Sequence, residues 1–231
     1  MDRSYILLWL EAPLQSWGHD SKFGRRDSLD FPTKSGIFGL LCCALGAGGE
    51  QTKLLASWAE RDLQVIAYAP SNTPRQPLLR DFHMVGSGYD NTDLWQNLLI
   101  PKKSDGNKAV NGGSKLTYRY YLQDMAYAVM LQGPKAELVD LDAALKNPVW
   151  DLYLGRKNCV PTEIIAQGIY SDLEQAIDRC EQLAASKNRK GIFKVLQGEY
   201  EGEVLTLNDV PLQFGEHKRY RDRRVTVIPM E

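Results

Sequence analysis

The stretch SYILLWL at residues 4–10, together with PTKSGIFGLLCCAL at residues 32–45, decides how the fold begins. The first segment is a continuous run of aromatic and aliphatic residues, which is typical of a strand buried on both faces. In the second segment Thr33 or Ser35 can cap a helix over residues 37–45, whose small apolar side chains suit tight packing on a sheet. The chain is therefore expected to open with a strand and a helix that covers it.

The rest of the chain is expected to contain both helices and strands. We expect helices at residues 52–61, 135–146 and 172–185, and strands at residues 63–69, 79–85, 116–122, 126–131, 164–170, 193–196, 204–207 and 225–228. This order predicts an α+β fold, ferredoxin-like or of a modified RNA-recognition-motif type, over residues 1–170. The helix and short strands of residues 171–231 are expected to form a small C-terminal α+β extension.

A long polar insert separates the expected strands at residues 79–85 and 116–122. It is rich in glycine, and a loop of this length inside a compact domain is usually functional or mobile. We therefore predict an inserted β-hairpin over residues 80–122 or so.

The composition is that of an ordinary folded protein, with 231 residues of which 43% are hydrophobic and 25% charged. No apolar run approaches the roughly 18 residues that a membrane span needs, and no signal peptide is present, so we expect a cytoplasmic protein with no membrane partner. The cysteines show no CxxC pair and no histidine at zinc-finger spacing. We accordingly expect no metal, no cofactor and no disulfide framework.

The formal net charge of −1 hides an uneven distribution of charge. Acidic residues concentrate at 137–142, 172–181 and 199–209, whereas basic residues gather at 22–26, 102–119 and 218–224. Phosphate binding depends on local positive potential rather than on net charge. The basic clusters are therefore compatible with a nucleic-acid partner.

Two basic segments have the residue types that hold single-stranded RNA. The turn at residues 32–36 places Lys34, a hydroxyl and free backbone N–H groups at a helix start, although, taken alone, an ordinary capped helix start is the better explanation of this turn. The basic insert lies beside Tyr118, Tyr120 and Tyr121, where bases can stack while cations track phosphates. The alternative is a solvated loop beside tyrosines of the sheet core. The turn at residues 154–158 and the cluster at 217–224 are further candidates.

His83, in the sequence Arg80-Asp81-Phe82-His83 at the base of the insert, is the one candidate for acid–base chemistry. A metal-independent ribonuclease could use this histidine with a tyrosine or lysine to move a proton from a 2′-hydroxyl. The alternative is a hydrogen-bonded structural histidine.

Five segments together resemble the CasD-type (Cas-five family) subunits of the type I-E CRISPR Cascade complex. They are residues 4–7 with Pro13, Gln15 and Trp17-Gly18; 31–36 with Gly39-Leu40; 79–83; 118–122; and 153–157. The resemblance spans residues 3 to 165 or so, and it implies that the inserted hairpin is a thumb at the guide RNA (crRNA). It also implies a non-catalytic subunit that holds the 5′ handle and contacts a CasC-like backbone subunit, a CasA-like large subunit and other Cascade subunits.

The resemblance and the residue chemistry together suggest which side chains meet RNA. The expected contacts are Gln15, Trp17, Arg25, Arg26, Lys34, Ser35, Arg80, His83, Arg119, Arg156 and Lys157. Two other functions stay open at this point. The first is an endoribonuclease that cuts repeat RNA, as relatives in type I-C systems do, and His83 would then be catalytic. The second is a protein-interaction scaffold that touches no RNA, and its basic clusters would then face partner subunits.

Overall fold

The computed structural model describes residues 3–19, 21, 24–85, 90, 92–99, 102–108 and 115–230. Parts of the expected insert, at 86–89, 91, 100–101 and 109–114, lie outside the described residues, as do Lys22 and the side chain of Lys115. The strands are β1 (Arg3–Gln15), β2 (Arg25–Arg26), β3 (Leu63–Pro70), β4 (Leu79–Val85), β5 (Lys115–Pro134), β6 (Ala166–Tyr170), β7 (Arg189–Gln197), β8 (Glu203–Gln213) and β9 (Arg219–Pro229). The helices are α1 (Lys34–Leu45), α2 (Thr52–Trp58), α3 (Leu94–Leu99), α4 (Lys135–Lys146) and α5 (Leu173–Ser186).

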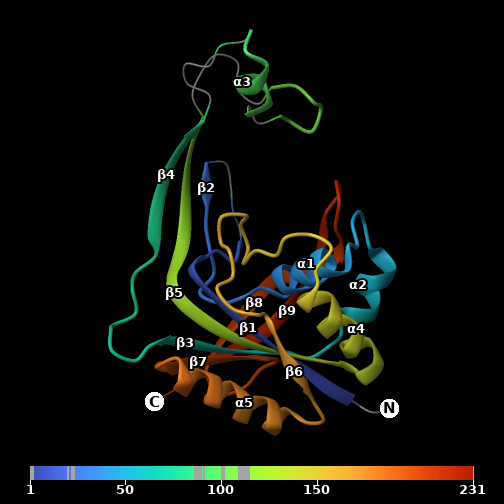
Figure 1. Cartoon of the computed structure of the whole chain (residues 1–231), viewed down its shortest axis with the longest axis vertical. Coiled ribbons are helices and arrows are strands. Elements are labelled where there is room, and N and C mark those ends of the chain that lie inside the picture. Colours follow the sequence, from blue (N-terminus) through green and yellow to red (C-terminus); the bar gives the residue numbers. More distant parts are fainter. Residues whose placement is uncertain are drawn as a thin grey trace.

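A large antiparallel sheet forms the body of the molecule, in the strand order β6-β1-β5-β3-β7-β9-β8 (Figure 1). The helices α1 and α4 contact each other above the sheet, and α5 lies below it (Figure 1). The protein therefore mixes helices and strands, as the sequence predicted, and helices cover both faces of its sheet (Figure 1).

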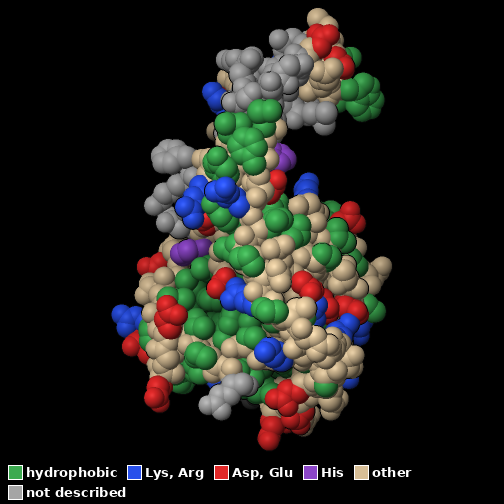
Figure 2. Space-filling view, turned by 90° about the vertical axis from the view of Figure 1, so that its left-hand side faces the viewer, with side chains coloured by type: hydrophobic (Ala, Val, Ile, Leu, Met, Phe, Trp, Pro, Cys, Tyr) green, Lys and Arg blue, Asp and Glu red, His purple; other side chains and the backbone are tan. Residues whose placement is uncertain are grey.

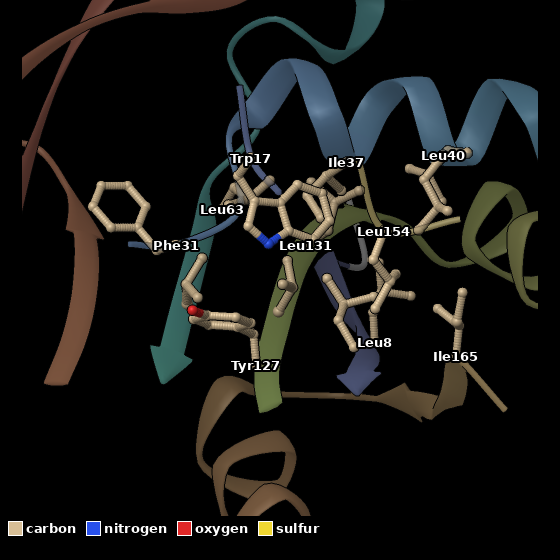
Figure 3. Close-up of a cluster of buried hydrophobic side chains, with 14 of the residues drawn as sticks. Leu8, Trp17, Phe31, Ile37, Leu40, Leu63, Tyr127, Leu131, Leu154 and Ile165 are labelled. Carbon is tan, nitrogen blue, oxygen red and sulfur yellow. The ribbon is translucent and has the colours of Figure 1, made fainter. Parts of the chain in front are cut away.

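The burial of β1 on both faces explains why its sequence is a continuous apolar run. Ile6, Leu8 and Leu10 point toward α1 and α4, while Leu7 and Trp9 point toward α5. Figure 3 shows Leu8 among the side chains that fill the space between the sheet and α1. Each layer of helices thus buries alternate residues of the same strand.

The helix α1 ends where its sequence indicates and begins three residues before the expected residue 37. The Thr33 hydroxyl accepts a hydrogen bond from the Gly36 N–H at 3.1 Å, which caps the N-terminus. At the other end Gly46 takes a left-handed conformation with φ of 68°, which a glycine adopts without steric cost. The expected capped helix start is confirmed.

One long strand replaces two expected ones. The strands predicted at 116–122 and 126–131 are both parts of β5, which runs from Lys115 to Pro134. Asp124 interrupts the apolar pattern with φ of 47°, but the pairing with β1 resumes on both sides of it, at Ala12↔Met125 and Leu14↔Gln123. The sequence predicts a break here because a local irregularity within a strand resembles the end of a strand.

The C-terminal strands join the main sheet rather than forming a sheet of their own. β7 pairs with β3 from Val65↔Val195 to Pro70↔Arg189, and Val225 of β9 lies in the same core as β1. The expected boundary near residue 170 therefore corresponds to no break in the sheet. β8 and β9 are also longer than expected, because Asp209 and the arginines of β9 obscure the apolar alternation.

Within the described part of the chain, no helix has the length and apolar character needed to cross a membrane.

Candidate nucleic-acid interface

The hairpin of β4 and β5 projects from the body and carries α3 near its far end (Figure 1). Its strands pair from Leu79↔Tyr121 to Val85↔Lys115. Because residues directly opposite each other in an antiparallel pair share a face, this register fixes two faces of different chemistry. The short strand β2 pairs with the other edge of β5 at Arg25↔Tyr118 and Arg26↔Arg119.

One face of the hairpin is aromatic and apolar. Its exposed side chains are Phe82 (55%), Met84 (55%), Leu116 (48%) and Tyr118 (43%). The rings of Phe82 and Tyr118 lie 5.5 Å apart between centroids. Figure 2 shows hydrophobic side chains along the hairpin and Lys and Arg side chains near its base. Large apolar groups left in water on a projecting strand pair indicate a surface that a ligand or partner covers.

Two arginines lie beside the rings of this aromatic face. The Arg80 guanidinium carbon is 5.4 Å from the centroid of the Tyr118 ring, and that of Arg25 is 5.0 Å from the Tyr120 ring. Arg25 also pairs with Asp27 at 2.7 Å, and this hydrogen bond raises the pKa of its guanidinium. The face therefore combines rings that can stack on bases with cations that can meet phosphates.

The opposite face of the hairpin borders a hollow of about 540 Å³ between the hairpin and the turn at 154–158. Its lining consists of Asp81, His83, Arg119, Tyr121, Tyr153, Gly155, Arg156, Lys157 and Asn158. Four of the predicted contacts, His83, Arg119, Arg156 and Lys157, are brought together here from three separate segments. A hollow with this excess of cations suits an anion such as a backbone phosphate.

The guanidinium of Arg156 makes contacts within the protein, unlike the exposed Lys157. It donates to the carbonyl of Tyr120 at 3.3 Å and to the carbonyl of Arg26 at 2.9 Å. It also lies over the Tyr121 ring, 4.6 Å from the centroid. The same turn contributes Asn158, whose amide donates to the Tyr121 hydroxyl at 3.2 Å.

The structure places Gln15 and Trp17 in the interior, so it does not present these two predicted contacts to a ligand. The Gln15 amide donates to the carbonyls of Leu10 and Met125, and its oxygen accepts from the Trp17 indole at 3.2 Å. Both side chains are almost completely buried, and Trp17 packs beside Ile37 (Figure 3). Their contribution is to hold the base of the hairpin-bearing strands against α1.

Lys34 is also buried, which corrects the expectation that its ammonium meets phosphate at the helix start. Its Nζ donates to the carbonyls of Ala59 and Arg61, at 2.8 and 2.7 Å, and to the Gln197 side chain at 3.1 Å. Burial, reinforced by the positive charge of Arg223, lowers the pKa of Lys34 to about 8. The neighbouring Ser35 is partly exposed, and its hydroxyl lies 3.3 Å from that of Thr33.

His83 lies at the edge of the charged hollow, with its Nδ1 3.8 Å from a carboxylate oxygen of Asp81. The hollow also contains Lys157 and the Tyr121 ring, so a histidine, a lysine and a tyrosine border one space. The Tyr121 side chain is buried, which limits its contact with a ligand, and its hydroxyl accepts a hydrogen bond from Asn158. This arrangement leaves the ribonuclease hypothesis as an alternative.

The exposed apolar residues of the hairpin are not among the site residues predicted from the sequence. Phe82 and Met84 alternate with Asp81 and His83, and this alternation was the available signal. Pairing β4 with β5 in register would have placed Phe82 opposite Tyr118. Among the described residues, no group of three or more His, Cys, Asp or Glu side chains is arranged to hold a metal ion.

The fold that carries this interface is found in solved proteins of CRISPR systems. A structure described as "CRISPR RNA-guided surveillance complex" contains a chain with 27% identity and a TM-score of 0.69, covering 98% of this chain and 90% of that one. Another, described as "Crystal structure of Cas protein", has 26% identity and a TM-score of 0.59, covering 97% and 94%.

Two sequence comparisons identify the family. The "CRISPR system Cascade subunit CasD" of Escherichia coli (strain K12) is 30% identical over 174 residues, which cover 72% of this chain and 71% of that protein. The model of the CRISPR-associated protein (Cas_Cas5) family matches residues 5–226. The chain belongs to the CRISPR-associated protein (Cas_Cas5) family.

Proposed function

We propose that this chain is a subunit of a Cascade-type, RNA-guided surveillance complex and that it binds the 5′ handle of the guide RNA without cutting it. The observation that carries the proposal is the β4–β5 hairpin, with exposed rings on one face and a cationic hollow against the other. Unpaired RNA is held in this way, by stacking on aromatic side chains and by cations along the phosphates. The likeness to CasD and to a surveillance-complex chain supports the same role.

In this proposal the hairpin is the thumb of a ferredoxin-like body. The elements β1, α1, β3, β5, α4 and β6 follow the order strand, helix, strand, strand, helix, strand, and their strands lie in the order β6-β1-β5-β3. Bases of the RNA stack on Phe82 and Tyr118, while Arg80, Arg119 and Lys157 bind phosphates. Backbone subunits and a large subunit of the complex are the proposed protein partners, and the cytoplasm is the proposed location.

Binding of labelled repeat RNA in EDTA, analysed on native and denaturing gels, tests the proposal. We expect a salt-sensitive mobility shift with intact RNA, because phosphate binding releases counterions. The double variant Phe82→Ala with Tyr118→Ala should weaken binding by at least about 30-fold, since each of the two lost stacks is worth about 1–3 kcal/mol. Ile164→Ala, which removes an exposed apolar side chain from the body, is the control. RNA binding that does not depend on salt or on the two rings would contradict the proposal.

The same gels decide the alternative function, a metal-independent endoribonuclease. His83, Lys157 and Tyr121 border one hollow, which is the specific observation in its favour. A discrete RNA product in EDTA that His83→Ala abolishes would make the chain a nuclease. The Arg119→Gln variant, which keeps His83, then separates loss of RNA binding from loss of proton transfer.

A further inference from the structure

The Arg156 side chain connects three separate parts of the chain at the base of the hairpin. It belongs to the turn at 154–158, donates to the carbonyl of Tyr120 in β5, and donates to the carbonyl of Arg26 in β2. Its planar guanidinium also lies 4.6 Å from the centroid of the Tyr121 ring. These contacts use two of the five N–H donors and one face of the group, so the protein itself fixes the orientation of the guanidinium.

The turn that carries Arg156 is held firmly by the body. Leu154 is fully buried, and its carbonyl accepts from the Ser16 N–H at 3.2 Å. Gly155 has φ of 91°, and a Cβ at this position would come within 1.6 Å of the Ser16 carbonyl oxygen. The Cys159 N–H donates to the Arg156 carbonyl at 2.8 Å and closes the turn. Arg156 therefore extends from a rigid point.

Arg156 contacts these segments at the point where the hairpin leaves the body. Tyr121 is buried, whereas Tyr118, three residues earlier in β5, is 43% exposed, so Arg156 contacts the strand where it leaves the body. The Tyr120 carbonyl also accepts from the Ser16 hydroxyl at 3.1 Å. β2 has only two residues, and besides its pairing with β5 it is tied by the bond from the Tyr118 N–H to the Gly24 carbonyl.

We propose that Arg156 is a positioning residue: it fixes the direction of the hairpin and of β2 relative to the body, while the adjacent Lys157 binds phosphate. The proposal rests on the RNA-binding function inferred above. Removing Arg156 loosens the hairpin base, so the aromatic face and Arg25 are no longer held in register with the charged hollow. Affinity for RNA then falls although no phosphate contact has been deleted.

The salt dependence of RNA binding distinguishes these roles in matched variants of the two neighbours. A lost phosphate contact lowers the slope of log affinity against log salt by about 1, whereas a lost positioning contact leaves it unchanged. We expect Arg156→Gln to weaken repeat-RNA binding by about tenfold with an unchanged slope. Lys157→Gln should lower the slope by about 1. Arg156→Lys keeps the charge but cannot form both bonds in the same geometry, so it should behave as Arg156→Gln does.

Hydrogen exchange of the free protein supplies a readout that needs no RNA. Arg156→Gln and Arg156→Lys should speed exchange of amides in residues 24–26 and 115–121, while Lys157→Gln leaves them as in the unmodified chain. The positioning role would be overturned by three results together. Arg156→Gln would show a lowered salt slope, Arg156→Lys would bind RNA fully, and hydrogen exchange would be unchanged in both variants. If the unmodified chain binds no RNA, the proposed function fails instead, and that outcome is separate because the exchange experiment still reports whether Arg156 holds the hairpin.

Discussion

Replacing the buried Lys34 with methionine should change the pH dependence of stability in a direction that the structure fixes. The Lys34 side chain is 0% exposed, and its ammonium is surrounded by the carbonyls of Ala59 and Arg61 and by the Gln197 amide. Burial lowers its pKa from 10.5 to about 8, because the charged form has lost its hydration and lies near Arg223. Methionine retains most of the apolar stem and cannot titrate.

The magnitude follows from the two pKa values. Between about pH 8 and 10.5 the unfolded chain holds the Lys34 proton and the folded chain releases it, so stability rises with pH in this window. This gain in folding stability from the release of the Lys34 proton is fully present above pH 10.5 and is lost as the pH falls through about 8. At about 1.4 kcal/mol for each pH unit, the whole shift corresponds to roughly 3 kcal/mol, of which about 2 kcal/mol should appear between pH 7 and pH 9.5.

Urea unfolding of the unmodified chain and of Lys34→Met at pH 7 and at pH 9.5 measures this effect. The difference in unfolding free energy between the two proteins cancels the titration of all other groups. Relative to Lys34→Met, the unfolding free energy of the unmodified chain should be about 2 kcal/mol higher at pH 9.5 than at pH 7. Lys53→Met, at an exposed position in α2, should show no such movement. A difference that stays constant for Lys34→Met would refute the reasoning, because the ammonium would then be as well solvated when folded as when unfolded.

Three further substitutions test other parts of the structure. Gly155→Ala should destabilise the fold by at least about 3 kcal/mol, because its Cβ would lie 1.6 Å from the Ser16 carbonyl oxygen; an unchanged urea midpoint would contradict this geometry. Glu137→Ala should lower the unfolding free energy by about 2–3 kcal/mol, since it removes the carboxylate that pairs with the largely buried Arg61 at 2.5 Å. As a control, Lys146→Ala removes an exposed lysine from its ion pair with Asp142 and should lower it by less than about 0.5 kcal/mol. Leu8→Ala should cost about 2–5 kcal/mol by chemical denaturation, and a smaller loss would show that the core between β1 and α1 closes around the gap.

The main elements of the body could be predicted because their patterns are local. The apolar run of β1, the cap at Thr33 and the amphipathic α4 each follow from residues within one element. The joining of β7 to β3 could not be predicted, because strand pairing between distant segments depends on packing that a single sequence does not display. For the same reason the C-terminal strands were expected in an extension of their own.

The place of the candidate interface could be anticipated from the residue types in the sequence, whereas the side chains that line it could be anticipated only in part. The basic insert and Tyr118 pointed to the hairpin, and Arg119 and Lys157 do lie together at one hollow. Lys34 illustrates the limit, because a lysine at a helix start looks like an anion ligand until the tertiary fold buries it. The burial of Gln15 and the internal bonds of Arg156 are likewise consequences of contacts between segments distant in sequence.

The continuity of β5 has a consequence for how members of this family can vary in length. One strand supplies both the central core of the body and one side of the hairpin, so its alternation of faces is shared by the two. A single-residue insertion or deletion between Tyr121 and Met125 would turn every outer side chain of the hairpin strand to the opposite face. Changes in the number of residues are therefore tolerated beyond Val85 and before Lys115, and homologues should differ in length there while keeping the spacing from Tyr118 to Tyr127 constant.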